Sequence, residues 1–519
     1  CLSCLVFAKH SLLLVEFTKK MFVELGLFFA FALLLTIYVR WKYAYWKKKN
    51  VPYTVPQFPF GNAENPFTRK YYFGEWLQKF YQSFKKRGEK HAGIYIITSP
   101  NYVPIDPEII KNIMQRDFAH FVDRGFYYNE KDEPLSAHLF AIGGQKWRNL
   151  RTKLTPTFTS GKMKMMFDTL VECTRPLEEI MNDFCASTLP VDIKDLLARF
   201  TTDVIGSCAF GLECNSFKSD NAEFRYHGRK IFEPKNKIDT LKILFSAARP
   251  EWARKLGVVL LPKDSTSFFF DVVKSTVNYR RTNNIHRKDM LQIVMDLEHP
   301  EKPSESSLSL EEIAAQAFVF FLAGFETSST TMTFCLYELA ANLDLQQKVR
   351  DEINQVLKSH NGKITYDAIM EMKYMNQVID ETLRKYPPVA FLTRQCVKDY
   401  VVPDQDVQIE KGTMVLISVL GLHRDPEYFK DPEKFDPERF SDENKHGIAP
   451  FTYIPFGEGP RLCIGMRFGM MQTKVGLACL LRNYSFSVSS RTQTPFKWDK
   501  FSFILTTEQP IWLDVRKIT

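Results

Sequence analysis

Residues 456–465 read Phe-Gly-Glu-Gly-Pro-Arg-Leu-Cys-Ile-Gly, and the rest of the chain is interpreted outward from this loop. The loop delivers one cysteine, Cys463, just ahead of a segment with helical patterning that runs from Met466 to Leu481. Its three glycines lack a β-carbon, so the backbone can turn tightly and approach a flat group closely. The spacing therefore predicts a cysteine held at a tight turn against a bound group.

The chemistry of Cys463 depends on whether its sulfur binds a metal. A cysteine thiolate can be the sole protein ligand of a haem iron, and its electron push then favours O–O cleavage. Phe456 could cover the sulfur, and a helix that starts after the cysteine would direct its positive end toward it. The alternative is a buried structural cysteine in a glycine-rich turn, the usual fate of a free cysteine.

A second motif lies upstream, where residues 323–328 read Ala-Gly-Phe-Glu-Thr-Ser inside a long apolar segment. Ser309 and Glu312 have the spacing of a capping box, so we predict that a helix starts near Ser309. Residues 314–323 have few polar interruptions, as expected of a helix that is buried on most sides. Taken alone, Glu326 and Thr327 are a solvated pair on that helix.

Together these motifs resemble a known family. The loop at 456–465 is similar to the haem-binding signature of the cytochrome P-450 monooxygenases. The resemblance implies that Cys463 is the axial thiolate ligand of the iron in haem b, and that Phe456 lies beside the sulfur.

The resemblance also assigns roles to the helix that starts near Ser309. In the family this helix crosses the distal face of the haem. Ala323 and Gly324 would form the oxygen pocket there, and Glu326 and Thr327 would be the acid and the hydroxyl that deliver protons to dioxygen.

A Glu-x-x-Arg pattern at Glu381 and Arg384 has the i,i+3 spacing of a helical ion pair. The same pattern occurs three more times in the chain, so chance explains most matches. This copy alone is followed by a Pro-Pro break and then by Arg439 ahead of the cysteine loop. The resemblance implies that Glu381, Arg384 and Arg439 form a buried structural network, in which losing one member would leave a charge unpaired.

Haem carries two propionate carboxylates, for which Arg and Trp donors are suited. Trp147 and Arg151 lie four residues apart, on one face of a predicted helix. The resemblance adds Arg461, Arg394 and Arg124 as further propionate partners. On composition alone, each of these arginines is a surface residue.

Three aromatic residues are candidates for a substrate pocket. Phe121 and Phe126 belong to the aromatic-rich segment 118–128, which resembles the variable loop over the distal haem. Phe320 shares a helix face with Thr327. An aromatic pocket suits apolar substrates, while packing in the core is the alternative for each residue.

We expect a fold that is mainly α with small β-sheets, in one large cytochrome P-450-type catalytic domain over residues 63–519. No internal repeat or low-complexity tract divides the chain after about residue 62, and 45% apolar residues suffice for a sizeable core. Strand patterning occurs near residues 93–97, 397–403, 414–420 and 501–506. The ten cysteines form no paired framework, which fits a reducing compartment.

The N-terminal part is predicted to be a membrane anchor with a basic stop, residues 21–49. Residues 22–39 are apolar except for three positions, which is just long enough to span a bilayer. Five of the nine net positive charges lie in residues 40–49, so they should stay cytoplasmic. A cleaved signal peptide is the rival, disfavoured because no small-residue cleavage site is evident. Residues 50–62 form a proline-rich linker, and residues 1–20 are interpreted as an upstream extension.

A closer resemblance comes from residues 155–167, which read Thr-Pro-Thr-Phe-Thr-Ser-Gly-Lys-Met-Lys-Met-Met-Phe. This stretch, with Asp123-Arg124-Gly125, is similar to the insect microsomal sixth family. The resemblance extends from residue 21 to the end. It implies an enzyme of the endoplasmic reticulum membrane, with the catalytic domain on the cytosolic face, that oxidises lipophilic xenobiotics such as plant toxins or insecticides.

The partners implied are O2, a lipophilic small molecule, NADPH-cytochrome P-450 reductase and cytochrome b5, and no nucleic acid is expected. Lys146, Arg148 and Lys153 resemble a basic patch for an acidic redox partner, with a solvated basic face as the alternative. Two other functions stay open from the residues alone. One is a reductase-independent haem-thiolate isomerase or dehydratase, and the other is a non-catalytic haem carrier or gas sensor.

Overall fold

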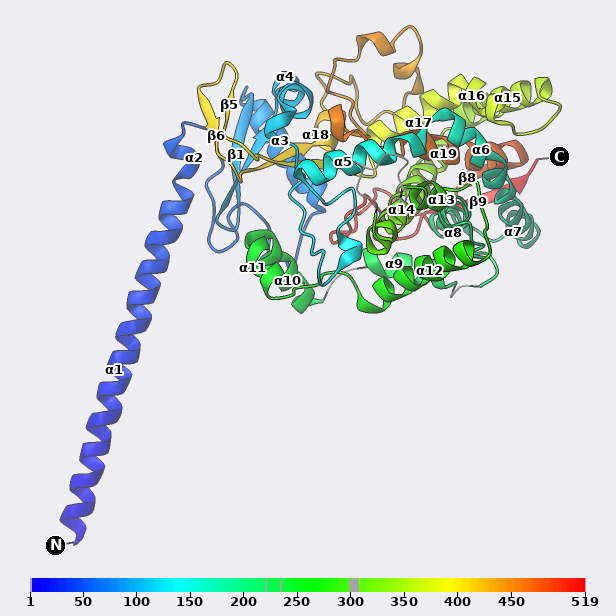
Figure 1. Ribbon diagram of the computed structural model, residues 1–519. Coiled ribbons are helices and arrows are strands. Elements are labelled where there is room, and N and C mark those ends of the chain that lie inside the picture. Colours follow the sequence, from blue (N-terminus) through cyan, green and yellow to red (C-terminus); the bar gives the residue numbers. More distant parts are fainter. Residues whose placement is uncertain (1, 220–221, 234–235, 298–307, 519) are drawn as a thin grey trace.

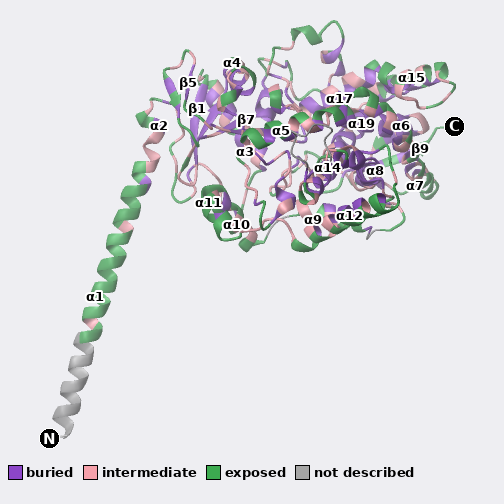
Figure 2. Ribbon diagram, in the orientation of Figure 1, coloured by how far each residue is buried: buried purple, intermediate pink, exposed green. Residues whose placement is uncertain are grey.

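The apolar segment after Ser309 forms the central helix of the molecule, α14 (Leu310–Ala341). Its start is confirmed as a capping box, because Ser309 Oγ accepts from the Glu312 N–H and the Glu312 carboxylate accepts from the Ser309 N–H. Most residues of α14 are buried, and Figure 2 shows the helix in the middle of the domain. The hydrophobic effect therefore favours this helix more than its capping does.

The protein, seen in a computed structural model, is described over residues 2–219, 222–233, 236–297 and 308–518. Helices dominate the fold (Figure 1). Besides α14, the helices are α1 (Leu2–Tyr43), α2 (Tyr45–Lys48), α3 (Phe73–Lys86), α4 (Pro107–Lys111), α5 (Gly144–Leu154), α6 (Ser160–Glu172), α7 (Thr174–Ser187), α8 (Ile193–Ile205), α9 (Glu223–Phe232), α10 (Lys237–Ala248), α11 (Pro250–Lys255), α12 (Lys263–Thr282), α13 (Met290–Met295), α15 (Leu343–Ser359), α16 (Tyr366–Glu371), α17 (Lys373–Lys385), α18 (Val419–His423) and α19 (Met466–Asn483).

The β-structure is small and lies in three sheets. One has the order β1-β2-β7-β4, a second β3-β9-β8, and a third pairs β5 with β6. The strands are β1 (His91–Ile96), β2 (Ser99–Pro104), β3 (Val191–Asp192), β4 (Phe391–Gln395), β5 (Tyr400–Val402), β6 (Val407–Ile409), β7 (Met414–Ser418), β8 (Tyr484–Val488) and β9 (Trp512–Lys517). The mainly α class with small sheets is confirmed.

Three of the four predicted strand regions contain a strand, and the one at 501–506 was wrong. Its backbone groups pair elsewhere: the Leu505 N–H donates to Pro388 O, and the Phe503 carbonyl accepts from the Tyr72 hydroxyl. These isolated contacts fix the segment as an irregular loop.

At the N-terminus, α1 projects away from the rest of the molecule (Figures 1 and 2). Its Glu16–Tyr43 part contains an 18-residue window with a mean hydropathy of 2.3, so the helix is long and apolar enough to cross a membrane. Contact with the rest of the protein is complete at Trp46, whose side chain is fully buried and whose Nε1–H donates to Ile94 O. A β-carbon at Gly93 would lie 2.4 Å from the Trp46 ring, so only glycine allows this packing.

The proline-rich stretch 50–62 lies against the first sheet. Tyr53 bridges to Gly93, and Gly61 bridges to Ile96, both in β1. The stretch therefore continues the packing that begins at Trp46.

Candidate active site

The cysteine loop is closed by its own backbone. The Cys463 N–H donates to Phe456 O at 3.0 Å, and Gly457 and Gly459 have φ angles of +73° and +70°. A β-carbon on Gly459 would lie 2.0 Å from the carbonyl oxygen of Met114, so the close approach there requires glycine. The third glycine of the loop has an ordinary negative φ and adjoins the first residue of α19.

The Cys463 side chain faces a space inside the protein. It retains exposed surface, yet burial by surrounding protein raises the pKa of its thiol. Exposed surface and a pKa raised by burial are compatible when a side chain lies on the wall of an internal cavity. The Gly465 N–H, Arg124 and Arg151 act in the opposite direction and lower this pKa. Because thiolate is the metal-binding form, these groups favour the state that iron requires.

Helix α14 also has accessible surface where its neighbours are buried. Ala323 is exposed although Phe321 and Phe325 on either side are buried. The Thr327 hydroxyl donates to Ala323 O at 2.7 Å. Glu326 is mostly buried and forms an ion pair with Lys194 of α8, 2.8 Å between Nζ and Oε1.

Helices α14 and α19 are joined directly at this level. Gln472 of α19 is fully buried, and its Nε2 donates to Gly324 O at 3.0 Å. The helix that follows the cysteine is therefore bonded to the helix that carries the Glu326 and Thr327 pair.

Arg461 lies at the centre of the loop contacts. Its guanidinium donates to the carbonyls of Val122, Leu139 and Ile142, and stacks 3.9 Å from the centre of the Trp147 ring. Burial lowers its pKa to about 9. Arg461 thus ties the cysteine loop to the segment before α5 as well as adding positive charge.

Three more predicted arginines lie around the same loop. Arg124 donates to Arg461 O, and Arg151 donates to Leu462 O. Arg394 is almost fully buried in β4, and its Nε has no hydrogen-bond partner among the described residues. Burial lowers the pKa of Arg394 to about 10 and that of Arg124 well below its usual value, with the neighbouring arginines adding to the effect on Arg124.

This arginine cluster tests whether a haem fits. Arg124, Arg151, Arg394 and Arg461 form no ion pair with a carboxylate in the part of the chain that the structure describes, and Arg394 keeps a buried donor unused. Buried cations without an anion are costly. A group with two carboxylates beside Cys463 supplies the missing anions, so the residues fit haem.

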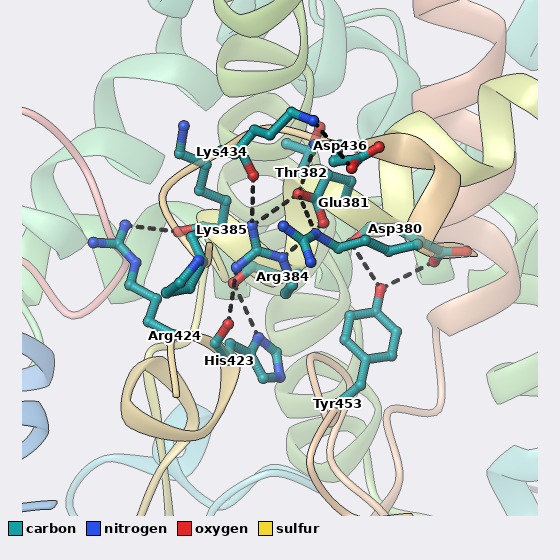
Figure 3. A network of polar contacts seen from close by, with 12 residues as sticks. Asp380, Glu381, Thr382, Arg384, Lys385, His423, Arg424, Lys434, Asp436 and Tyr453 are labelled. Atoms are coloured by element: carbon teal, nitrogen blue, oxygen red, sulfur yellow. Dashed lines mark hydrogen bonds and ion pairs between the residues drawn. The ribbon is translucent and has the colours of Figure 1, made fainter. Parts of the chain in front are cut away.

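Glu381 and Arg384 of the predicted network are fully buried and form a bidentate pair (Figure 3), while the Arg439 side chain is 14% exposed. Arg384 donates from Nε and Nη2 to the two Glu381 oxygens at 2.7 and 2.8 Å. Arg439 lies 3.5 Å from Glu381, and the Asp436 N–H donates to the same carboxylate. The structure therefore brings together the three residues that the family resemblance placed in one network.

His423 is a member of this network that the sequence did not reveal. The Ile454 N–H donates to its Nε2 at 2.9 Å, so its Nδ1 carries the proton that bonds to Arg384 O. Burial lowers the pKa of His423 to about 3, which keeps the ring neutral. His423 connects the ion pair to the residues just before the cysteine loop.

The three pocket candidates have different surroundings. Phe126 is half-buried and packs on Phe140 and Phe503. Phe121 is fully buried against Tyr400 in the core around the first sheet, and Phe320 is buried against Phe158. Phe121 and Phe320 therefore pack in the core, the alternative given for each, while Phe126 is half-buried.

Comparison with known proteins agrees with this site. The family model described as Cytochrome P450 matches residues 65–514. Cytochrome P450 6A1 of Musca domestica is 45% identical over 97% of this chain and 99% of that protein. Probable cytochrome P450 6a14 of Drosophila melanogaster is 45% identical over 92% and 96%, and Cytochrome P450 6a2 of the same organism 39% over 96% and 100%. The chain therefore belongs to the cytochrome P450 family and is a haem-thiolate monooxygenase.

Proposed function

We propose that this monooxygenase inserts one oxygen atom from O2 into lipophilic foreign compounds, using electrons from NADPH through a membrane-bound reductase. The observation that carries the proposal is an accessible thiol inside the protein, surrounded by arginines that lack carboxylate partners. A carrier or sensor would need the thiolate and the arginines, but no proton-delivering pair on α14.

Haem, when bound, supplies the activation of dioxygen. Cys463 would be its axial ligand, and Arg124, Arg151, Arg394 and Arg461 with Trp147 would hold its propionates. Arg461 would contribute to propionate binding in addition to its structural role, in which its guanidinium donates to three backbone carbonyls.

Glu326 and Thr327 would move protons to bound dioxygen. In the described structure the Thr327 proton is engaged by Ala323 O, while the hydroxyl oxygen can still accept a proton from a donor. Ala323 leaves room beside this hydroxyl, because its side chain is small and the residue is exposed. Proton delivery through Glu326 and Thr327 would favour formation of product over release of peroxide.

The substrate class rests on aromatic side chains. Phe126, Phe140 and Phe503 pack together from two loops, and Arg124 stacks 4.3 Å from the centre of the Phe140 ring. An aromatic wall beside a propionate-binding arginine would favour flat or branched apolar compounds. The relatives named above are insect proteins, which is consistent with oxidation of plant toxins or insecticides.

The redox partner would bind on the outer side of the cysteine loop. A groove of about 560 Å³ lies there, lined by Phe456, Leu462, Met466 and the exposed Arg467. Arg148 of α5 is exposed and lies three residues before Arg151. Lys146 is already paired with Glu130 and Glu312. We assign this face to the reductase, with cytochrome b5 as a second donor.

The membrane assignment combines two apolar surfaces. Helix α1 would span the endoplasmic reticulum membrane with the basic residues 40–49 on the cytosolic side. Helices α10 and α11 present Leu241, Phe245 and Trp252 to solvent, followed by exposed Leu256. These side chains would rest in the membrane surface beside the substrate entrance.

Reconstitution tests the proposal. The full chain, incubated with reductase, NADPH and a set of lipophilic probes, should give oxygenated products that carry oxygen from ¹⁸O2. Product formation without NADPH, or haem-loaded protein that consumes no NADPH with any probe, would contradict it.

A further inference from the structure

The carboxylate of Glu326 is held by one lysine from another helix. Lys194 Nζ lies 2.8 Å from Glu326 Oε1, and the two side chains are 22% and 14% exposed. The same ammonium donates to Ser329 Oγ at 3.0 Å and to Thr330 Oγ1 at 2.7 Å. An ammonium has three N–H donors, so all of them are used on one side of α14. Lys194 therefore has a fixed position.

A second buried cation near Glu326 is already occupied. Arg225 of α9 is close enough for Glu326 to affect its pKa, but its guanidinium pairs with Asp195. Lys194 is thus the cation in direct contact with Glu326 among the described residues.

The position of Lys194 is set by the packing of α8 on α14. Lys194, Thr201 and Ile205 are seven and four residues apart, so they lie on one face of α8. The Thr201 hydroxyl donates to Phe325 O at 2.8 Å. A β-carbon added to Gly324 would lie only 2.7 Å from Cδ1 of Ile205. Gly324 therefore permits the close approach of α8.

The contacts run in opposite directions along the two helices. Moving from Ile205 back to Lys194 on α8 corresponds to moving from Gly324 forward to Thr330 on α14. The face of α8 that carries Lys194, Thr201 and Ile205 therefore lies along the segment of α14 from Gly324 to Thr330. Lys194 consequently meets α14 at the Glu326 carboxylate and the hydroxyls of Ser329 and Thr330.

We propose that Lys194 is a positioning residue for oxygen activation: it holds the carboxylate of Glu326, the residue before Thr327 in α14, in one position and so sets the efficiency of proton delivery. The inference rests on the proposed role of Glu326. Without the lysine, the Glu326 carboxylate would sample several rotamers, and it would spend less time in the position from which it delivers protons. Proton delivery would slow, and reducing equivalents would leave as peroxide.

A double-mutant cycle tests this role. Lys194→Met, Glu326→Gln and the double variant are compared in the full, haem-loaded chain for product per NADPH, peroxide per NADPH and the solvent deuterium isotope effect on product formation. We expect Lys194→Met to lower product per NADPH about tenfold, the effect of losing one charge-assisted contact. It should also raise the solvent isotope effect, and it should add nothing in the Glu326→Gln background.

Two further variants separate positioning from structure. Lys194→Arg keeps the charge and should recover most of the coupling. Lys385→Met breaks a Lys–Glu pair of the same 2.8 Å length, with Glu338 on the same helix α14 but far from the site. It should lower the melting temperature and leave the isotope effect unchanged.

The outcomes distinguish the two claims. If Glu326→Gln changes neither coupling nor the isotope effect, the proposed role of Glu326 fails. If Glu326→Gln uncouples turnover but Lys194→Met does not, or if the two effects simply add, the positioning role of Lys194 is overturned. Should Lys194→Met fail to fold, Lys194→Gln in the same cycle decides on the same criteria.

Discussion

At the scale of single residues, the site depends on side chains whose charge or hydroxyl is placed by the backbone around them. Thr327 makes an i−4 hydrogen bond to Ala323 O that many helical threonines make. Its special property is location, beside a helix position with accessible surface in an otherwise buried segment. The residue type alone does not distinguish it from the other threonines of α14.

Removing the Thr327 hydroxyl should therefore uncouple the reaction without unfolding the protein. We expect Thr327→Ala to consume NADPH, to release peroxide, and to lower product per NADPH by about tenfold or more. Thr333→Ala is the matched control, because Thr333 makes the same bond to Ser329 O and is buried elsewhere on α14. Unchanged coupling in Thr327→Ala would remove this residue from the proton path.

Arg394 gives a prediction about haem retention. Its buried Nε lacks a partner, so loss of the side chain should cost mainly the contact with a propionate, about 1.5–3 kcal/mol for a hydrogen bond to a charged group. Arg394→Leu should release haem to apomyoglobin at least about tenfold faster than the parent protein. Arg148→Leu, at an exposed position, should release it at the parent rate.

The sequence could identify residues that act through their own motif. The cysteine loop is a local pattern, and the family resemblance built on it assigned Glu381, Arg384 and Arg439 to one network, so these residues were predicted individually. His423 and Lys194 were not predicted, since their partners are Ile454 and Glu326, which are distant in sequence. Such pairs become visible only when the fold brings separate elements into contact.

At the scale of elements, the ion-pair network controls how the cysteine loop is supported. His423 ends α18 and accepts from the Ile454 N–H two residues before Phe456. It thereby links α17, α18 and the loop in one chain of buried hydrogen bonds. We expect stability and haem binding to be coupled at this position.

Replacing His423 should destabilise the protein strongly. His423→Leu would leave the Ile454 N–H and the Arg384 carbonyl unpaired in the interior, at about 1–3 kcal/mol for each group. We therefore expect a loss of about 2–6 kcal/mol of unfolding free energy, together with faster haem loss, in chemical denaturation followed by haem absorbance. Parent-like stability would mean that water or a neighbouring group replaces the ring.

The same residue predicts a pH dependence. The folded pKa of His423 is about 3, below the usual 6.5, so the unfolded chain binds the proton more readily between these values. The stability that neutral His423 contributes is present above pH 6.5 and is lost as the pH falls. From pH 7 to pH 5 the parent should lose about 2 kcal/mol more than His423→Leu. Equal losses in the two proteins would contradict this assignment.

Helices were easier to predict than strands. The capping box and apolar run define α14 locally, whereas β2 has Pro100 and Pro104 within a six-residue strand and became a strand by pairing with β1 and β7. Strands β8 and β9 pair across more than twenty residues of loop. Their pairing depends on tertiary contacts that no local pattern records.

At the scale of the whole molecule, the exposed N-terminal helix joins the packed domain near Trp46. The side chains of α1 from Phe17 to Trp41 are largely exposed, while Trp46 belongs to the core around the first sheet. Packing against the domain therefore begins between these residues, ahead of the proline-rich stretch 50–62.

Deletion of residues 1–40 should separate the two functions of the N-terminal region. The shortened chain keeps Trp46 and should fold and bind haem as the full chain does, but bind vesicles weakly through the exposed side chains of α10 and α11. Sedimentation with vesicles measures this. In the full chain, Trp46→Ala should instead lower stability by about 3–5 kcal/mol and leave vesicle binding intact.

The central claim is that Cys463 is the thiolate ligand of haem, and the reduced carbon monoxide difference spectrum tests it most directly. A thiolate ligand shifts the haem band far to the red of a histidine-ligated haem. The full chain should show this red-shifted band, and Cys463→Ser should lose it while retaining its fold. An unshifted band in folded, haem-loaded parent protein would contradict the haem-thiolate assignment.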